Sequence, residues 1–136
     1  ECRCSDLEIQ RYRNRLSDPF LDRIDLFVQM RECRPDDAPT MSSKELHEQV
    51  RVAFSMQKRR GQEVLNGKLE DRDIEAVCVM EPDANSVLES AGLRFGLSHR
   101  SLQKTKKVAR TIADLSEMEV INKSSMLEAL SFRRRE

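Results

Sequence analysis

The stretch LSHRSLQKTKKVARTIADL, residues 97–115, decides the fold that we expect for this chain. On a helical wheel of about 100° per residue, its apolar side chains fall within one arc and its charged side chains occupy the other. Ser98 can cap this helix, because a serine hydroxyl accepts a bond from a free backbone N–H of the first turn. The expected apolar face holds Leu102, Thr105, Val108, Ala109, Ile112, Ala113 and Leu115, and the expected polar face holds Arg100, Gln103, Lys104, Lys106, Lys107, Arg110 and Asp114.

Helical patterns continue through most of the chain. Two Ser–Glu capping boxes, at Ser5 and at Ser42, predict helix starts, and Gly61 and Gly96 predict helix ends. Leu46, Val50, Ala53 and Phe54 form the expected buried stripe of the helix that Ser42 opens. Besides the helix that Ser98 caps, we expect helices over residues 6–15, 42–60, 71–79, 82–95 and 123–134, with short turns near Pro19 and at residues 65–67.

Residues 24–30 follow a different period. Ile24, Leu26, Val28 and Met30 alternate with more polar positions, and a period of two predicts a β-strand. A lone strand cannot satisfy its own backbone donors and acceptors, so its partners are either missing from this chain or supplied by another. Residues 31–41 are rich in Pro and Asp and predict a linker.

The composition excludes several classes of protein. The 136 residues carry 24 Lys+Arg and 24 Asp+Glu, and this neutral balance argues against a protein that coats nucleic acid over its whole surface. No apolar run approaches the roughly 18 residues of a membrane span, and the polar first residues predict no signal peptide, so we expect a cytoplasmic protein without a membrane partner. The chain begins with Glu1 and not with Met, which leads us to expect a piece of a longer protein.

The sequence also lacks the common catalytic motifs, including the phosphate-binding loop G-x-x-x-x-G-K-[ST] and the nucleophile elbow G-x-S-x-G. Cys2 and Cys4 offer half of a zinc site at most, because a structural site needs four N or S ligands, so no complete metal site is expected in this chain. Cys78 lies in an apolar run and is expected to be a buried, unreactive thiol.

Two basic features leave alternatives open. Residues 99–110 carry five Lys or Arg and no acid, which suits either phosphate near a helix N-terminus or a solvated helix face. Arg23 lies between a turn and the expected strand, where it either points outward rigidly or pairs locally with Asp22 or Asp25.

Four stretches carry a family resemblance: CRCS at residues 2–5, RYRNRLSDPFLDRIDLFV at 11–28, Leu65-Asn66 followed by Leu69, and residues 97–115 with EAL at 128–130. They resemble the C-terminal part of magnesium-chelatase-like AAA+ ATPases, in the branch of the competence-associated ComM and YifB-type proteins. The resemblance implies a mainly α fold. Residues 39–136 would form the helical lid domain, and residues 1–38 would form the helix–strand end of the α/β ATPase core with a linker.

The same resemblance implies roles for individual residues. Arg23 matches the arginine finger that reaches into a neighbouring subunit's nucleotide site, and Arg100 matches the sensor 2 arginine that contacts the γ-phosphate of ATP in its own subunit. Lys104, Lys107 and Arg110 are further candidates for contact with phosphate or nucleic acid. ATP and Mg²⁺ would bind to the full-length protein. That protein would form a homo-oligomeric ring, which we expect to be a hexamer. The chain alone would be inactive, because the phosphate-binding loop would lie upstream.

The function that the resemblance implies is ATP-driven DNA remodelling, as a helicase or branch-migration activity in competence. Two other functions remain open. One is an ATPase subunit in magnesium chelation that acts on a porphyrin. The other is a stand-alone basic helical module that binds nucleic acid through Lys104, Lys106, Lys107 and Arg110.

Overall fold

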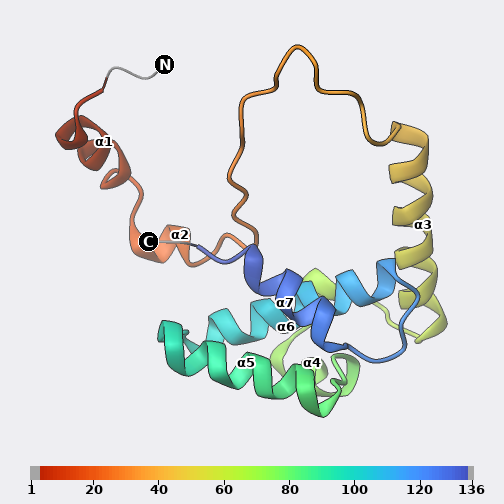
Figure 1. The fold of residues 1–136 in the computed structure, drawn as a ribbon. Helices are drawn as coiled ribbons and strands as arrows, with labels where there is room; N and C mark the ends of the chain where they lie inside the picture. The colour runs from red at the N-terminus through yellow and green to blue at the C-terminus, as the bar shows by residue number, and fades with distance from the viewer. Residues whose placement is uncertain (1–3, 135–136) are drawn as a thin grey trace.

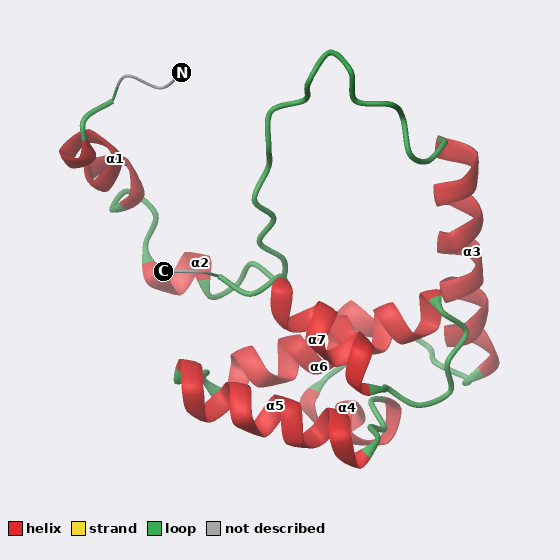
Figure 2. Ribbon diagram, in the orientation of Figure 1, coloured by secondary structure: helices red, strands yellow, loops and turns green. Residues whose placement is uncertain are grey.

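The structure, a computed structural model, describes residues 4–134, and this part of the chain folds mainly as helices, as predicted (Figure 2). The central helix α6 contacts α3, α4, α7 and the short 3₁₀-helix η1, and α5 packs on α7 (Figure 1). No described helix combines the length and the apolar character needed to cross a membrane. The elements are α1 (Asp6–Arg13), α2 (Asp18–Leu21), α3 (Ser43–Arg59), η1 (Asn66–Lys68), α4 (Asp71–Val77), α5 (Pro82–Phe95), α6 (His99–Leu115) and α7 (Lys123–Ser131).

The helix ends follow from local chemistry. Both predicted capping boxes are formed, with the serine hydroxyl accepting from the glutamate N–H and the glutamate accepting from the serine N–H. The backbone N–H groups of Ser5 and Ser42 lower the pKa values of Glu8 and Glu45, since they stabilise the ionised carboxylates. Gly96 ends α5 in the left-handed conformation, with φ of 58°. Helices α1, α4 and α7 are shorter at their C-terminal ends than the sequence predicted.

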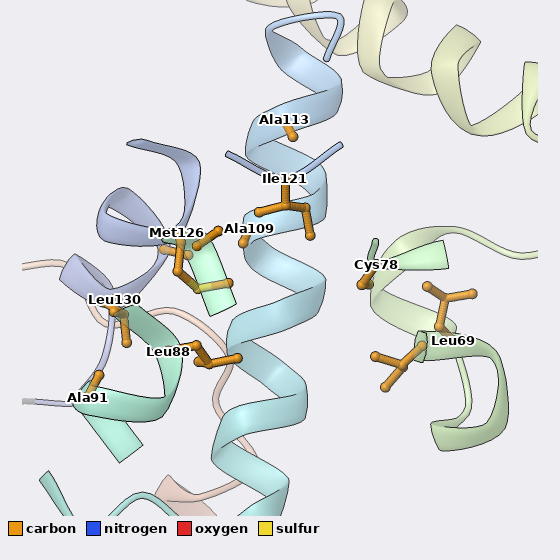
Figure 3. Packing of buried hydrophobic residues seen from close by; sticks show 12 residues of the cluster. Leu69, Cys78, Leu88, Ala91, Ala109, Ala113, Ile121, Met126 and Leu130 are labelled. Carbon is orange, nitrogen blue, oxygen red and sulfur yellow. The ribbon is translucent and has the colours of Figure 1, made fainter. Parts of the chain in front are cut away.

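The hydrophobic core surrounds α6. Figure 3 shows this helix passing between Leu88, Ala91, Met126 and Leu130 on one side and Leu69 and Cys78 on the other. Small side chains at the contacts let neighbouring helices approach closely. The buried apolar residues of the cluster are Leu69, Ile74, Cys78, Ala84, Leu88, Ala91, Ala109, Ala113, Ile121, Met126, Ala129 and Leu130.

The polar side of α6 is not a solvated face along its whole length, which was one of the two readings that the sequence left open. Gln103 is buried, and Arg110 and Asp114 have no exposed surface. Asp114 accepts two bonds of 2.7 Å from Arg60, at the end of α3, and one of 2.8 Å from the amide of Asn66 in η1. The helical wheel was wrong here because a partner 54 residues away in sequence covers this side of the helix.

Arg110 completes this buried polar cluster. Its guanidinium lies 3.1 Å from Asp114 and donates to the carbonyl oxygens of Met118 and Glu119 in the loop that follows α6. Burial lowers the pKa of Arg110, and the charge of Asp114 acts in the opposite direction. The cluster therefore joins α3, η1, α6 and the next loop.

The expected buried stripe of α3 is only partly formed. Ala53 is buried, together with Met56 and Gln57, but Leu46, Val50 and Phe54 are exposed. Figure 1 shows the reason, since the N-terminal half of α3 extends beyond the other helices of the bundle. The apolar spacing predicted the helix correctly, but it could not show how far the bundle reaches along it.

The strand expected at residues 24–30 is absent from the described part of the chain, where these residues are extended but form no ladder. One backbone bond anchors the segment, from the Phe27 N–H to the Phe132 carbonyl at 2.8 Å. Leu26, Val28 and Met30 are exposed. A strand forms only when a neighbouring strand accepts and donates along its edge, and no such neighbour lies beside this segment in the described chain.

Replacing Asp114 with alanine should destabilise the bundle strongly, because two arginines would lose their shared carboxylate. Breaking a buried ion pair by removing one partner costs about 3–5 kcal/mol, and we expect a loss of that size in the free energy of unfolding, measured by urea denaturation. Glu75→Ala is the matched control, since Glu75 is an exposed partner of Lys106 and its loss should cost at most about 1 kcal/mol. An Asp114→Ala loss as small as that of the control would contradict the structural role of the buried cluster.

Cys78 should resist alkylation in the folded protein, because burial raises the pKa of its thiol to about 11. At pH 8 that pKa leaves about one thiol in 10³ as the reactive thiolate. We expect iodoacetamide at pH 8 to modify the exposed Cys33 and to leave Cys78 unmodified, as read by peptide mass spectrometry. Labelling of Cys78 should rise as the pH approaches 11, and denaturation should remove the difference. Equal labelling of both cysteines in the native protein would show that Cys78 is not protected.

Candidate functional site

Arg23 lies directly after the short helix α2 and is exposed. Its guanidinium Nη1 donates to the carbonyl of Pro19 at 2.7 Å, so the side chain folds back along its own turn. The N–H of Arg23 donates to Phe20 and the N–H of Ile24 donates to Leu21, which continues the turn past the end of the helix. The local pairing with Asp22 or Asp25 that the sequence left open is not the interaction that holds Arg23.

Arg100 lies in the first turn of α6. The Ser98 hydroxyl accepts from the Ser101 N–H and caps the helix, as predicted. The side chain of Arg100 is 58% exposed, and its Nε lies 3.6 Å from a carboxylate oxygen of Asp22. Backbone N–H groups at a helix start have no partner within the helix, so this end of α6 favours an anion.

Lys104 lies one turn further along α6 and holds the segment that bears Arg23. Its ammonium donates to the carbonyl of Asp22 at 2.7 Å and to the carbonyl of Ile24 at 3.0 Å. The Lys104 side chain is only 15% exposed. Ser101 adds a contact of 3.4 Å from its hydroxyl to the Asp22 carboxylate.

The structure therefore brings together three of the five candidate residues. Arg100 and Lys104 contact Asp22, and Arg23 follows Asp22 in the chain; we call these four residues with Ser101 the Asp22 cluster. Sequence reasoning missed the role of Asp22, because its partners lie about 80 positions away and no local periodicity reports such a pairing.

The other two candidates lie apart from the cluster. Lys107 contacts the carbonyl oxygens of Gly67 and Leu69 at 3.4 Å each. Arg110 is fully buried against Asp114, so it offers no surface to a phosphate or a nucleic acid. The predicted basic helix face is thus divided among separate intramolecular contacts.

The end of α7 also holds the N-terminal segment. Arg134 donates to the carboxylate of Asp18 at 2.9 Å, beside the bond between the backbones of Phe27 and Phe132. Arg133 stacks on Phe95, with its guanidinium carbon 3.8 Å from the ring centre. The segment that bears Arg23 is thus anchored by both α6 and α7, whereas α1 lies away from the bundle (Figure 1).

Of the expected cysteine half-site, Cys2 lies outside the described residues 4–134, and Cys4 is exposed. Within residues 4–134, no group of three or more His, Cys, Asp or Glu side chains is arranged to hold a metal ion.

Comparisons with known proteins agree on one family. The family described as "Magnesium chelatase, subunit ChlI C-terminal" matches residues 40–133, and the family described as "Magnesium chelatase, subunit ChlI" matches residues 1–38. Similar curated proteins are "Uncharacterized protein YifB" of Salmonella typhimurium, 39% identical, the YifB of Escherichia coli, 37% identical, and "Competence protein ComM" of Haemophilus influenzae, 34% identical. Each similarity covers 96% of this chain, but only 26–27% of the relative. The chain thus spans about a quarter of the length of these relatives.

Proposed function

Because this chain belongs to the magnesium chelatase ChlI family of AAA+ proteins, we propose that it supplies two arginines to the nucleotide sites of a ring-forming ATPase. Arg23 acts as the arginine finger for a neighbouring subunit, and Arg100 acts as sensor 2 in its own subunit. The observation that carries the proposal is that both arginines are exposed and that the segment bearing Arg23 is held against the first turns of α6, where Arg100 contacts Asp22.

The chemistry of Arg23 suits a finger. An arginine supplied by a neighbouring subunit stabilises the charge that develops on the transferred γ-phosphoryl group, and in other NTPases this raises the rate by about 10³–10⁵. Here Arg23 donates only to a backbone carbonyl of its own turn among the contacts described, so no carboxylate neutralises its charge. The guanidinium can give up that single bond for a phosphate oxygen.

Arg100 suits a phosphate contact for two reasons. It is more than half exposed, and its pairing with Asp22 is long at 3.6 Å, so it contributes little to hold the side chain in place. The adjacent N-terminus of α6 adds backbone donors for an anion. Arg100 would bind ATP through its phosphates, and the cofactor would supply the energy of the cycle.

The two matched ranges support the proposed domain organisation. Residues 1–38 would form the C-terminal end of the ATPase core, and residues 39–136 would form the helical lid. The phosphate-binding loop and the residues that hold Mg²⁺ would belong to an upstream part of a longer, cytoplasmic protein. This chain alone would not hydrolyse ATP. Neighbouring copies would complete each other's sites in a ring, which we propose to be a hexamer.

The substrate that we propose is DNA, remodelled by a helicase or branch-migration activity. The support is the similarity to a relative named as a competence protein. Magnesium chelation is the second candidate, because both matching families are described as chelatase subunits. A stand-alone nucleic-acid module is disfavoured, since Arg110 is buried and Lys104 and Lys106 are largely covered.

Arg23→Ala in the full-length protein should abolish ATP turnover while ATP binding stays nearly intact. The loss in kcat should reach about 10³-fold or more, because the substitution removes charge stabilisation that matters only in the transition state. Steady-state ATPase assays and equilibrium binding of a fluorescent ATP analogue measure the two effects separately. Arg72→Ala is the control, since Arg72 is an exposed arginine that pairs with Glu70 on the bundle surface. Near-normal turnover by Arg23→Ala would refute the finger assignment.

DNA should stimulate the ATPase of the full-length protein, and a porphyrin with Mg²⁺ should not. Contacts to DNA phosphates release counterions, so the stimulation should weaken steeply between about 50 and 200 mM salt. Turnover assays with branched DNA, linear DNA and protoporphyrin across that range would measure the preference. Stimulation by the porphyrin alone would favour the chelation role over DNA remodelling.

A further inference from the structure

We propose that Lys104 is a positioning residue that fixes the backbone of Arg23 to α6, and so couples the nucleotide site that Arg100 senses to the neighbouring site that Arg23 completes. This inference rests on the proposed function of the two arginines. It assigns to Lys104 a role within the protein in place of the contact with phosphate or nucleic acid expected from the sequence.

The geometry of the two Lys104 bonds carries the inference. Its ammonium has three donors and directs two of them at the carbonyl oxygens of Asp22 and Ile24, at 2.7 and 3.0 Å. These carbonyls belong to the residues immediately before and after Arg23. Bonds from a charged donor are shorter and stronger than neutral ones, and here they restrain the backbone on both sides of Arg23.

Few other contacts restrain this stretch of chain, and the ion pair of Arg134 with Asp18 that also holds it is exposed. The side chain of Arg23 bonds only within its own turn among the contacts described, and Phe27 provides the next backbone bond to the bundle, at Phe132. The contacts of Asp22 with Ser101 and Arg100 are longer, at 3.4 and 3.6 Å. Lys104 is also the most covered of the basic groups in the Asp22 cluster, with its side chain 15% exposed.

The two cationic side chains of α6 at this site differ in how readily they can change partner. Arg100 and Lys104 are one helical turn apart and point to the same face. The Arg100–Asp22 pair is long and half exposed, so Arg100 can exchange Asp22 for a phosphate oxygen. Lys104 keeps its two carbonyl bonds during that exchange, because they do not involve the Asp22 carboxylate.

The consequence is a mechanical link. Any movement of α6 that accompanies the engagement of Arg100 with phosphate is transmitted through Lys104 to the segment of Arg23. Both sites then bias one structural element, which is the physical requirement for coupling between them. A subunit would present its finger according to the nucleotide state of its own site.

Lys104→Met in the full-length protein tests this link, with Lys104→Arg as the conservative variant that keeps charged donors. The matched control is Lys106→Met, which removes an equally covered lysine of the same helix that pairs with Glu75 instead. Hydrogen exchange at the Phe27 amide reports whether the segment stays docked, and exchange at the buried Ile74 amide reports whether the bundle stays intact.

We expect Lys104→Met to speed exchange at Phe27 and to leave exchange at Ile74 unchanged. Its kcat for ATP should fall by about 10- to 100-fold, as expected when a reacting group is misplaced by about 1 Å. KM should change by less than about twofold, because Lys104 does not contact the nucleotide. Lys104→Arg should recover most of the rate, and Lys106→Met should behave as the wild type.

The outcomes separate this inference from the proposed function. If Arg23→Ala lacks turnover but Lys104→Met keeps the normal kcat, the positioning role is overturned and the finger assignment stands. A rise in KM with unchanged kcat would instead identify Lys104 as a nucleotide contact and would also overturn it. If Arg23→Ala itself turns over ATP normally, the proposed function fails first, whatever Lys104→Met does to exchange at Phe27.

Discussion

The carboxylate of Asp114 is the constraint on which the rest of the bundle depends. A carboxylate with no exposed surface is stable in its ionised form only when charge and hydrogen bonds around it are matched. Arg60 and Arg110 supply the charge and Asn66 supplies an amide donor. Because these partners come from different segments, satisfying one buried group fixes the end of α3, η1 and the loop after α6 against the same helix.

This arrangement fixes the position of the helix that carries two residues of the candidate site. Asp114 lies 14 residues beyond Arg100, which is about 21 Å along a helix that rises 1.5 Å per residue. The C-terminal half of α6 is held by buried charge and by core alanines, so its N-terminal half can present Arg100 and Lys104 in a fixed relation. Within the Asp22 cluster, the pair of Arg100 with Asp22 is exposed and long, yet it forms on this rigid support.

Local patterns predicted the helices, since caps and periodicity act within a few residues, and α5 begins and ends where the sequence indicated. They failed where contacts between residues far apart in the sequence determine whether a side chain is buried. Arg110 lies on the polar side of its helical wheel and is buried, whereas Val50 lies on an apolar stripe and is exposed. For the site, the resemblance selected Arg23 and Arg100, but the contact between Asp22 and Lys104 spans 82 positions and has no signal in a single sequence.

The long loop between α2 and α3 has a thermodynamic consequence. Figure 1 shows it arching clear of the bundle while both of its ends remain attached to helices. Such a tether makes the docking of residues 22–24 an intramolecular event, with an effective concentration set by the length and stiffness of the loop. Contacts too weak to join two separate molecules are then sufficient to keep the segment docked.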